Sequence, residues 1–401
     1  MIFLIFITLI TGLQVLHRRL LHRLFPPRLD HLVLPFLVLV HLPLTLYMLV
    51  RLTGGAGSAL WLRPFARLGA YFQLLTVMNL LVWALASLVW RWTHLWRRRV
   101  APDTPHRRAE DADPLEDPQR RRFLRQTSAT GVGLAVWVGA RGRIEAASDP
   151  DIVRLELSFP DLPPGLDGLR LVQISDLHAG PLVEAAQVQR WRRLAEGERP
   201  EVLLITGDLV DSLPGESQAV VDAFRDFRAP LGRFAILGNH DYFTDPRPIW
   251  KAVGDIGVEF LENRNAVVER KGARLGLVGL QDPMARHGRF RSIYFGPGPA
   301  PELALQGLAP DAWRLCLSHR PSDWHLAKRT GARLTLSGHT HGGQVNLIPG
   351  VSSALLLGPY TQGLYQEDGL SMYVNRGLGV VGLPMRVGAP PEISVVTLRR
   401  G

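Results

Sequence analysis

The chain has 401 residues, more than a typical single domain, and a formal net charge of +10 at pH 7. Residues 1–150 hold 19 Arg and 9 acidic residues, whereas residues 151–401 hold 27 basic and 27 acidic residues. This balance argues against a basic nucleic-acid-binding face on the C-terminal part, so we expect no nucleic-acid partner. The one cysteine, Cys316, excludes an intrachain disulfide and, within an apolar run, is expected to pack as a small buried side chain.

The N-terminal part contains three apolar segments, at residues 2–16, 31–50 and 70–90, without Asp, Glu, Lys or Arg. A membrane-spanning helix needs about 20 mainly apolar residues. We therefore predict a membrane domain with three transmembrane helices over residues 1–100 and the lipid bilayer as a partner. Buried core helices of a soluble domain are the alternative, which the Arg clusters beside the segments disfavour.

Residues 101–126 are polar, charged and rich in Pro, which predicts a flexible linker. The linker ends in the run Arg-Arg-Arg-Phe-Leu-Arg at 120–125, and the weakly apolar segment 127–140 follows. This order resembles a twin-arginine export signal, although it does not begin the chain. We predict that residues 127–145 form a fourth transmembrane helix or an uncleaved signal-anchor; an ordinary linker is the alternative.

Arginine counts predict the orientation in the membrane. With four spans, loops 17–30 and 91–126 hold 14 Arg, whereas loops 51–69 and 141–150 hold 5. The positive-inside rule then places the first two loops in the cytoplasm and the C-terminal domain on the extracytoplasmic side. If residues 127–140 do not cross, that domain is cytoplasmic instead.

From about residue 150 the sequence alternates between short apolar runs and amphipathic segments, which predicts a sheet-centred α/β domain. The predicted strands are 152–158, 169–174, 202–206, 233–237, 274–280, 312–318, 333–337, 371–375 and 393–398. The predicted helices are 184–196, 217–227, 247–256 and 322–330.

Five of the apolar runs are followed directly, or after one residue, by carboxylate, amide or imidazole side chains. The motifs are Ser175-Asp176-Leu177-His178, Gly207-Asp208-Leu209-Val210-Asp211, Gly238-Asn239-His240-Asp241, Ser318-His319-Arg320 and Gly338-His339-Thr340-His341-Gly342. Open α/β sheets bind ligands at the carboxyl ends of their strands, so these side chains are expected to converge. In the last motif, two histidines two residues apart can face one cation if the segment is extended. A polar loop that merely contains two histidines is the alternative.

This ordered set resembles the calcineurin-like metallophosphoesterase superfamily. The later sequence Tyr373-Val374-Asn375-Arg376-Gly377-Leu378-Gly379, followed by Pro384-Met385-Arg386, is similar to its membrane-anchored bacterial branch. The resemblance covers residues 150–401, the predicted catalytic domain, and implies two packed mixed β-sheets flanked by helices. It also implies a site for two metal ions. One ion would be bound by Asp176, His178 and His341, the other by Asn239, His319 and His339, with Asp208 bridging both.

The resemblance further implies hydrolysis of a phosphate ester by a hydroxide shared between the two cations. His240 would protonate or stabilise the leaving oxygen. Asp241 would orient His240, or alternatively cap a turn. Asp211 would hold a histidine or water around the metals, or cap a helix. Arg320 and Arg376 would contact the phosphate, or form surface ion pairs.

Mixed His, Asp and Asn ligation suits Mn, Fe, Zn or Co, and the resemblance favours Mn. We expect a phosphodiesterase or pyrophosphatase in the inner membrane of a bacterium. The unusually apolar stretch 347–365 is expected to be a buried strand or a lipid-facing rim, and the latter favours a lipid-linked substrate over a soluble phosphodiester. A catalytically silent metal-binding or scaffolding protein is disfavoured by the complete motif set, and a sensor or transporter by the few polar residues in the predicted spans.

Overall fold

The computed structural model of the chain describes residues 118–288, 294–348 and 350–401 continuously. It also describes isolated positions nearer the N-terminus, at 12, 15, 16, 76, 80, 82–89, 91–93, 95 and 96. The chain divides into two units, Met1–Arg141 and Gly142–Gly401. The predicted spans 2–16 and 31–50 thus lie almost entirely outside the described residues, and the predicted span 70–90 lies there in part.

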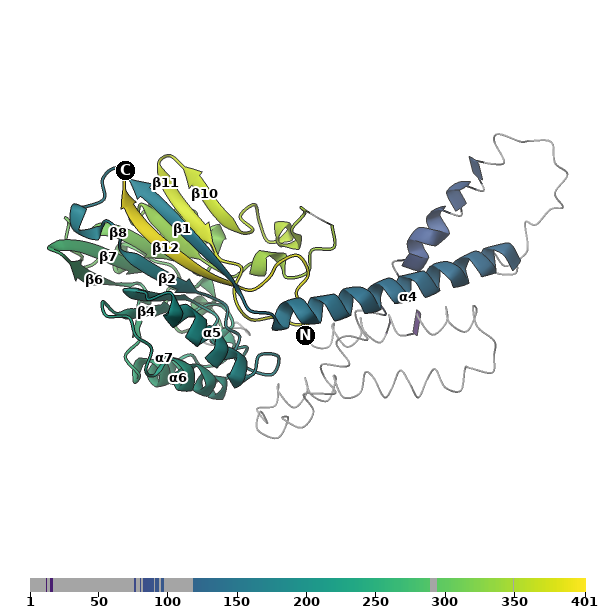
Figure 1. Cartoon of the computed structure of the whole chain (residues 1–401), viewed down its shortest axis with the longest axis horizontal. Coiled ribbons are helices and arrows are strands. Elements are labelled where there is room, and N and C mark those ends of the chain that lie inside the picture. Colours follow the sequence, from purple (N-terminus) through teal and green to yellow (C-terminus); the bar gives the residue numbers. More distant parts are fainter. Residues whose placement is uncertain are drawn as a thin grey trace. The chain divides into compact units, whose positions relative to one another are not determined.

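A long helix, α4, runs from Pro118 to Ala147 (Figure 1). It contains the segment 127–140, where the sequence suggested a fourth membrane crossing. Among the helices that the structure describes, none combines the length and the apolar character needed to cross a bilayer. The helix is therefore present but the predicted crossing is not supported, because Thr, Ser, Gly and Arg residues dilute its apolar side chains. The predicted extracytoplasmic position of the C-terminal domain depended on that crossing.

Within the described residues, one sheet has six strands. In spatial order these are β1 (Asp151–Phe159), β12 (Glu392–Arg400), β2 (Arg170–Ile174), β3 (Val202–Thr206), β4 (Arg233–Ile236) and β5 (Glu259–Phe260). β12 pairs parallel with β1 and antiparallel with β2, and the strands from β2 to β5 run parallel. The polar motifs that follow β2, β3 and β4 therefore all lie at the same end of this sheet.

The second sheet is also mixed. In spatial order it contains β10 (Gly363–Glu367), β11 (Leu370–Val374), β9 (Leu334–Ser337), β8 (Trp313–Leu317), β7 (Ala273–Gly279) and β6 (Arg264–Arg270). Its central strands run parallel, and antiparallel pairs close it at both edges. Two mixed sheets are what the resemblance implied.

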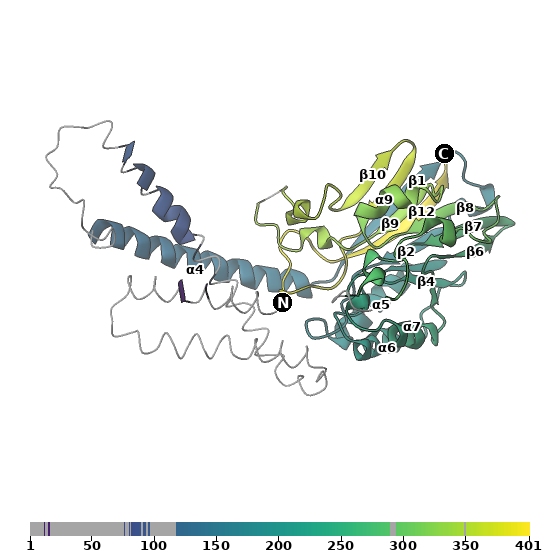
Figure 2. The same ribbon diagram turned by 180° about the vertical axis from the view of Figure 1, so that it is seen from behind.

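Helices cover the outer faces of the sheets (Figures 1 and 2). The described helices after α4 are α5 (Ala185–Gly197), α6 (Gln218–Phe224), α7 (Arg247–Gly254), α8 (Pro301–Ala304) and α9 (Trp324–Lys328). Single 3₁₀ turns occupy Pro164–Leu166, Pro214–Ser217, Asp241–Phe243, Pro283–Arg286, Pro321–Asp323, His341–Gly343 and Ser353–Leu356.

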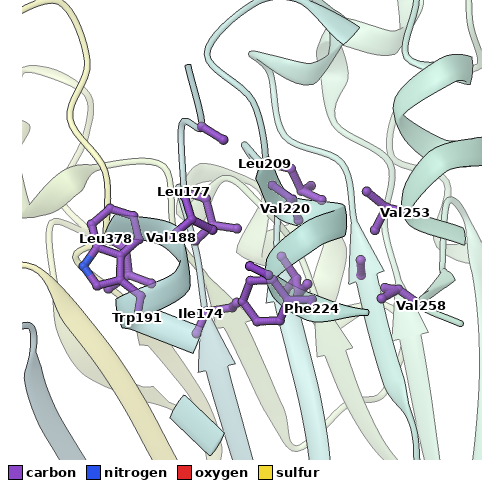
Figure 3. Close-up of a cluster of buried hydrophobic side chains, with 14 of the residues drawn as sticks. Ile174, Leu177, Val188, Trp191, Leu209, Val220, Phe224, Val253, Val258 and Leu378 are labelled. Atoms are coloured by element: carbon purple, nitrogen blue, oxygen red, sulfur yellow. The ribbon is translucent and has the colours of Figure 1, made fainter. Parts of the chain in front are cut away.

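Alternation along the central strands divides the core into layers. In β3, Leu204 packs between the two sheets, whereas Leu203 and Ile205 pack beneath the helices. Figure 3 shows the helix-side layer, where Ile174 lies near Trp191 and Phe224. Because both faces of these strands are buried, their sequences are continuous apolar runs. Burial also fixes the register of each strand, and therefore the position at which its polar motif begins.

All nine predicted strands are present, whereas β5, β6 and β10 were missed. These three are edge strands, which keep one side in solvent and therefore lack a continuous apolar pattern. The stretch 347–365 is not a buried strand. It contains a mostly exposed 3₁₀ turn and an isolated bridge between Ile348 and Val351, and it joins a sheet only from Gly363. Cys316 is fully buried, as predicted.

Candidate metal centre

The carboxyl ends of strands from both sheets meet at one place, as the strand-end motifs predicted. A backbone hydrogen bond of 3.0 Å from Asp176 N to the Gly207 carbonyl joins the segments after β2 and β3. Gln173 links the sheets, because its Nε2 donates to the Ser337 carbonyl of β9 at 2.9 Å. The motif side chains are therefore held by both sheets at once.

The first group of candidate ligands is Asp176, His178 and His341. One ligand atom from each lies within 4.8 Å of the other two, and all three residues are buried. The Nε2 atoms of the two histidines are 3.1 Å apart, and Nε2 of His341 is 3.5 Å from Oδ1 of Asp176. The group offers two imidazoles and a carboxylate to a single point.

The second group is Asp208, His319 and His339, again with ligand atoms within 4.8 Å of one another. Oδ1 of Asn239 lies 3.2 Å from Nε2 of His319 and adds an amide oxygen. Oδ2 of Asp208 lies 3.4 Å from Nε2 of His319 and also 3.4 Å from Nε2 of His178. Asp208 therefore stands between the two groups, the position predicted for a bridging ligand.

The protonation of the histidines fits metal binding. Burial lowers the pKa of His178 to about 3, and it also lowers the pKa values of His339 and His341 well below the usual range. Neutral imidazoles have a lone pair for a cation, whereas imidazolium does not. Together with the carboxylates, this is a donor set suited to divalent transition metals.

His319 and Asp208 behave as an ion pair. Burial lowers the pKa of His319, but neighbouring Asp208 outweighs it and raises the value to about 10. Burial would raise the pKa of Asp208, yet His319 and His240 hold it well below its usual range. The proton on His319 therefore neutralises the negative charge of Asp208. A divalent cation bound to both side chains would replace this proton, so metal binding is expected to release it.

The backbone at the site is strained. A non-glycine residue in the left-handed region costs roughly 1–3 kcal/mol and persists only where its surroundings enforce it. Five candidate ligands have such φ angles, namely Asp176 (52°), His178 (45°), Asp208 (51°), His339 (72°) and His341 (53°). Half of the ten described non-glycine residues with positive φ are therefore candidate ligands.

Two motif glycines allow the loops to approach this closely. A Cβ atom at Gly238 would lie 2.3 Å from Oδ1 of Asp208, and one at Gly338 would lie 2.3 Å from Oδ2 of Asp176. Real Cβ atoms do not occur at such distances, so a larger residue at either position would displace a candidate ligand.

The ring of His240 is oriented by a main-chain group. Its Nδ1 donates to the carbonyl oxygen of Asp211 at 2.6 Å, because a carbonyl can only accept. The ring also lies 4.2 Å from that of Phe243 and 4.6 Å from that of His178, between ring centroids. Asp211 thus contacts His240 through its main-chain carbonyl, whereas the role predicted for its side chain around the metals stays a prediction.

The prediction that Asp241 orients His240 is wrong. The Asp241 carboxylate is fully buried and accepts hydrogen bonds from the backbone N–H groups of Leu209, Val210 and Gly238, at 3.3, 3.1 and 2.9 Å. It therefore ties the loop after β3 to the loop after β4, which is a positioning role. Burial raises the pKa of Asp241 to about 7.

Arg320 and Arg376 form ion pairs, the alternative to phosphate contact. Arg320 makes two hydrogen bonds to Asp282, of 2.7 and 3.1 Å. Arg376 contacts Glu392 at 2.7 Å and Asp151 at 2.9 Å. Since carboxylates already balance both guanidinium groups, the structure does not support either as a phosphate ligand.

Comparison with known proteins agrees with this geometry. Residues 169–343 match the family model of the calcineurin-like phosphoesterases. The metallophosphoesterase YkuE of Bacillus subtilis is 31% identical over 247 residues, which cover 59% of this chain and 82% of that protein. The chain belongs to the calcineurin-like metallophosphoesterase superfamily. Membership implies divalent metal ions, which the candidate ligand groups could hold.

Eukaryotic members of the superfamily are also similar. The transmembrane protein with metallophosphoesterase domain of Danio rerio is 35% identical over 284 residues, and that of Bos taurus is 32% identical over 290 residues. Each match covers 69% of this chain but only 63% and 64% of those proteins. The expected assignment to a bacterial branch is therefore not confirmed.

Sequence reasoning gave no role to Arg386, which the structure places behind the metallophosphoesterase motifs. Its guanidinium is fully buried, and Nη2 lies 3.3 Å from Nδ1 of His341. It donates to the carbonyl oxygens of Arg376, Gly377, Gly379 and Ala389. The Pro384-Met385-Arg386 run was noticed, but nothing local distinguishes a buried arginine from a surface one.

A second buried acid, Glu262, supports the loop that carries His240. Its Oε1 accepts from Leu237 N at 2.6 Å, and the Tyr242 hydroxyl donates to its Oε2. Burial raises the pKa of Glu262 to about 8. The side chain is therefore protonated in the folded protein at neutral pH.

We predict that Asp241→Ala lowers the free energy of unfolding by about 3 kcal/mol or more, because three buried N–H groups lose their acceptor at about 1–3 kcal/mol each. Urea unfolding measures this loss. Asp245→Ala, at a partly exposed carboxylate four residues away, is the control and should change stability by less than about 1 kcal/mol. Unchanged stability with lost turnover would instead assign Asp241 to the chemistry.

We also predict that Glu262→Gln removes a pH dependence of stability. The folded pKa is about 8 and the unfolded value 4.5, so the folded state binds the extra proton between these values. Stability of the parent should therefore fall as pH rises through that window, with a slope of about 1.4 kcal/mol per pH unit from this group. In urea unfolding between pH 5 and about 9, the free energy of unfolding of the variant should rise relative to that of the parent as the pH increases. The exposed Glu269→Gln should stay parallel to the parent, and a Glu262→Gln curve parallel to it would contradict the prediction.

Proposed function

We propose that the chain is a dinuclear metallophosphoesterase of the phosphodiesterase or pyrophosphatase type. The observation that supports this most is Asp208, whose Oδ2 lies 3.4 Å from an imidazole nitrogen of each group. One ion would be held by Asp176, His178 and His341, and the other by Asn239, His319 and His339, with Asp208 shared. Mn is preferred, and Fe, Zn or Co also suit this donor set.

Bound divalent cations supply a water nucleophile at neutral pH and neutralise charge on the phosphate oxygens. The chain's contribution is to hold its ligands before the metals arrive. Strained backbone fixes the carboxylates, and burial keeps three imidazoles neutral. Pre-organised groups need little rearrangement during the reaction, which lowers its barrier.

In this proposal His240 acts on the leaving group. Since Nδ1 donates to the Asp211 carbonyl, Nε2 is the nitrogen that can exchange a proton with substrate. His240 is half-buried, whereas the candidate ligands His178 and His319 are almost fully buried. In its imidazolium form, with protons on both nitrogens, the ring would donate Nε2–H to the oxygen that departs from phosphorus and keep its Nδ1–H on the Asp211 carbonyl.

We further propose that the chain is attached to a membrane and acts on a lipid-linked phosphate ester. The uncharged segments 2–16, 31–50 and 70–90 support attachment. So does the name of the vertebrate relatives, transmembrane proteins with a metallophosphoesterase domain. Attachment favours substrates that lie in the same membrane.

Asp208→Asn is predicted to abolish metal-dependent turnover. Asn keeps an oxygen for the hydrogen bond from His240 N, which is 2.7 Å from Oδ1 of Asp208, but lacks a second anionic oxygen to share. Protein stripped of metal and reloaded with Mn should hydrolyse bis-p-nitrophenyl phosphate or p-nitrophenyl phosphate, and elemental analysis should find two ions per chain. The variant should retain at most one ion. A parent that binds no metal would exclude the proposal.

His240→Ala is predicted to lower kcat roughly 10²–10⁴-fold while both ions remain bound. The effect should shrink for an ester with a good leaving group, because a weakly basic oxygen needs no proton as it departs. Comparing p-nitrophenyl with alkyl phosphates tests this directly. An equal loss on both substrates would show that His240 does not protonate the leaving group.

A further inference from the structure

Exposed apolar side chains gather on one loop beside the metal centre. Residues 347–357, here called the apolar loop, hold six of the eleven exposed large hydrophobic side chains that the structure describes from Gly142 onward. Leu356 is 91% exposed. The others are Leu347, Ile348, Val351, Leu355 and Leu357, at 47–64% exposure. A monomeric protein in water rarely exposes such a cluster without a partner for it.

The composition of the apolar loop indicates the kind of partner. Residues 342–366 contain no Asp, Glu, Lys, Arg or His. Surfaces that bind other proteins usually have a polar rim with charged residues, which give specificity. The acyl chains of a bilayer cannot hydrogen-bond or pair with a charged side chain, so a segment that enters them is expected to lack charges. An uncharged apolar loop therefore fits lipid better than it fits protein.

The base of the loop is tied to the metal-binding motif. Asn346 Nδ2 and Ser352 Oγ each donate to the Gly342 carbonyl at 2.9 Å, and Ser353 Oγ donates to the Gly343 carbonyl. These glycines directly follow His341. The leucines are thus presented at a set distance from the candidate ligands.

The apolar loop also leaves the domain where the N-terminal chain enters it. At the end of α4, the Gly142 carbonyl accepts from Arg386 N at 2.9 Å, and the adjacent Val387 carbonyl accepts from Asn346 N at 2.8 Å. Ile144, on the same helix end, is 72% exposed. Figures 1 and 2 show this loop region beside the end of α4 and away from the C-terminus. In the sequence, the apolar segments 2–16, 31–50 and 70–90 all precede this helix.

We propose that the apolar loop inserts into the lipid bilayer to which the N-terminal segments attach the chain. Insertion holds the His341 side of the metal centre at the membrane surface, where the phosphate esters of lipids lie. The inference rests on the membrane attachment given under Proposed function, but not on catalytic activity.

The test uses the full chain in phospholipid vesicles. Leu356→Cys is labelled with an environment-sensitive NBD fluorophore, and Leu303→Cys, on α8 and 44% exposed, is the matched control. The native Cys316 is fully buried and should stay unlabelled. Lipids with a nitroxide on the acyl chain are expected to quench the label at 356 at least twofold more than the label at 303. Its emission should also shift to shorter wavelength.

Equal quenching at the two positions would overturn the proposal. A blue-shifted label at 356 that acyl-chain nitroxides do not quench would mean that protein, such as a second copy of the chain, covers the loop, and would also overturn it. Flotation of the same vesicles tests attachment separately. Chains that float without quenching at 356 retain the membrane attachment but refute insertion of the loop.

The experiment is independent of the phosphoesterase chemistry. Asp208→Asn in the labelled chain should be quenched like its parent, because residue 208 lies outside the loop. Quenching in a parent that shows no turnover would support the inserted loop while counting against the proposed activity.

Discussion

Two buried carboxylates, three buried imidazoles and the half-buried imidazole of His339 lie close together at the ends of the two sheets, and removing them from water is the constraint on which the site depends. Burial is the largest influence on Asp176 and, although neighbouring His319 opposes it, the pKa of this carboxyl rises to about 6. Burial drives His178 toward the neutral form, so the cluster loses most of its own charge. Coulomb attraction then allows one full ion pair, between Asp208 and His319. A bound cation would stabilise such a cluster, because it would supply several of these side chains at once with a partner in place of the water that they lost.

The rest of the fold supplies the rigidity that such a cluster needs. The central strands bury both faces, so a one-residue slip of register is prevented and each motif begins at a fixed point. The loops then turn sharply through left-handed backbone at Asp176, Asp208 and His341, among others. Neighbouring carboxylates fasten these loops through main-chain hydrogen bonds, as Asp241 does for the loop after β3. Buried acids thus serve two purposes here: Asp176 and Asp208 belong to the candidate ligand groups, whereas Asp241 holds the loops in place.

The sequence was informative where a pattern is local and repeated. Apolar runs that end in polar motifs predicted the central strands and the convergence of their ends, whereas the resemblance to the superfamily implied the members of both ligand groups. The edge strands β6 and β10 escaped because their solvent side breaks the apolar pattern. The long-range partners were also missed: nothing near Arg320 or Arg376 in the sequence predicts pairing with Asp282 or Glu392. The partner of His240 was wrongly assigned for the same reason. Every residue has a backbone carbonyl, so the sequence does not indicate which one a histidine contacts.

Arg386 is another residue whose contacts with main-chain carbonyls could not be predicted from the sequence. Its guanidinium is buried, and main-chain carbonyl oxygens between Arg376 and Ala389 accept hydrogen bonds from it. Burial lowers its pKa only to about 10, so the guanidinium stays charged and adds positive potential beside His341. That potential opposes protonation of His341 and favours the adjacent Asp176 as an anion. Burial lowers the pKa of His341 most, and this cation adds to the effect, so the imidazole stays in the neutral form that binds a metal. A lysine lacks the planar guanidinium and could not donate the same set of hydrogen bonds.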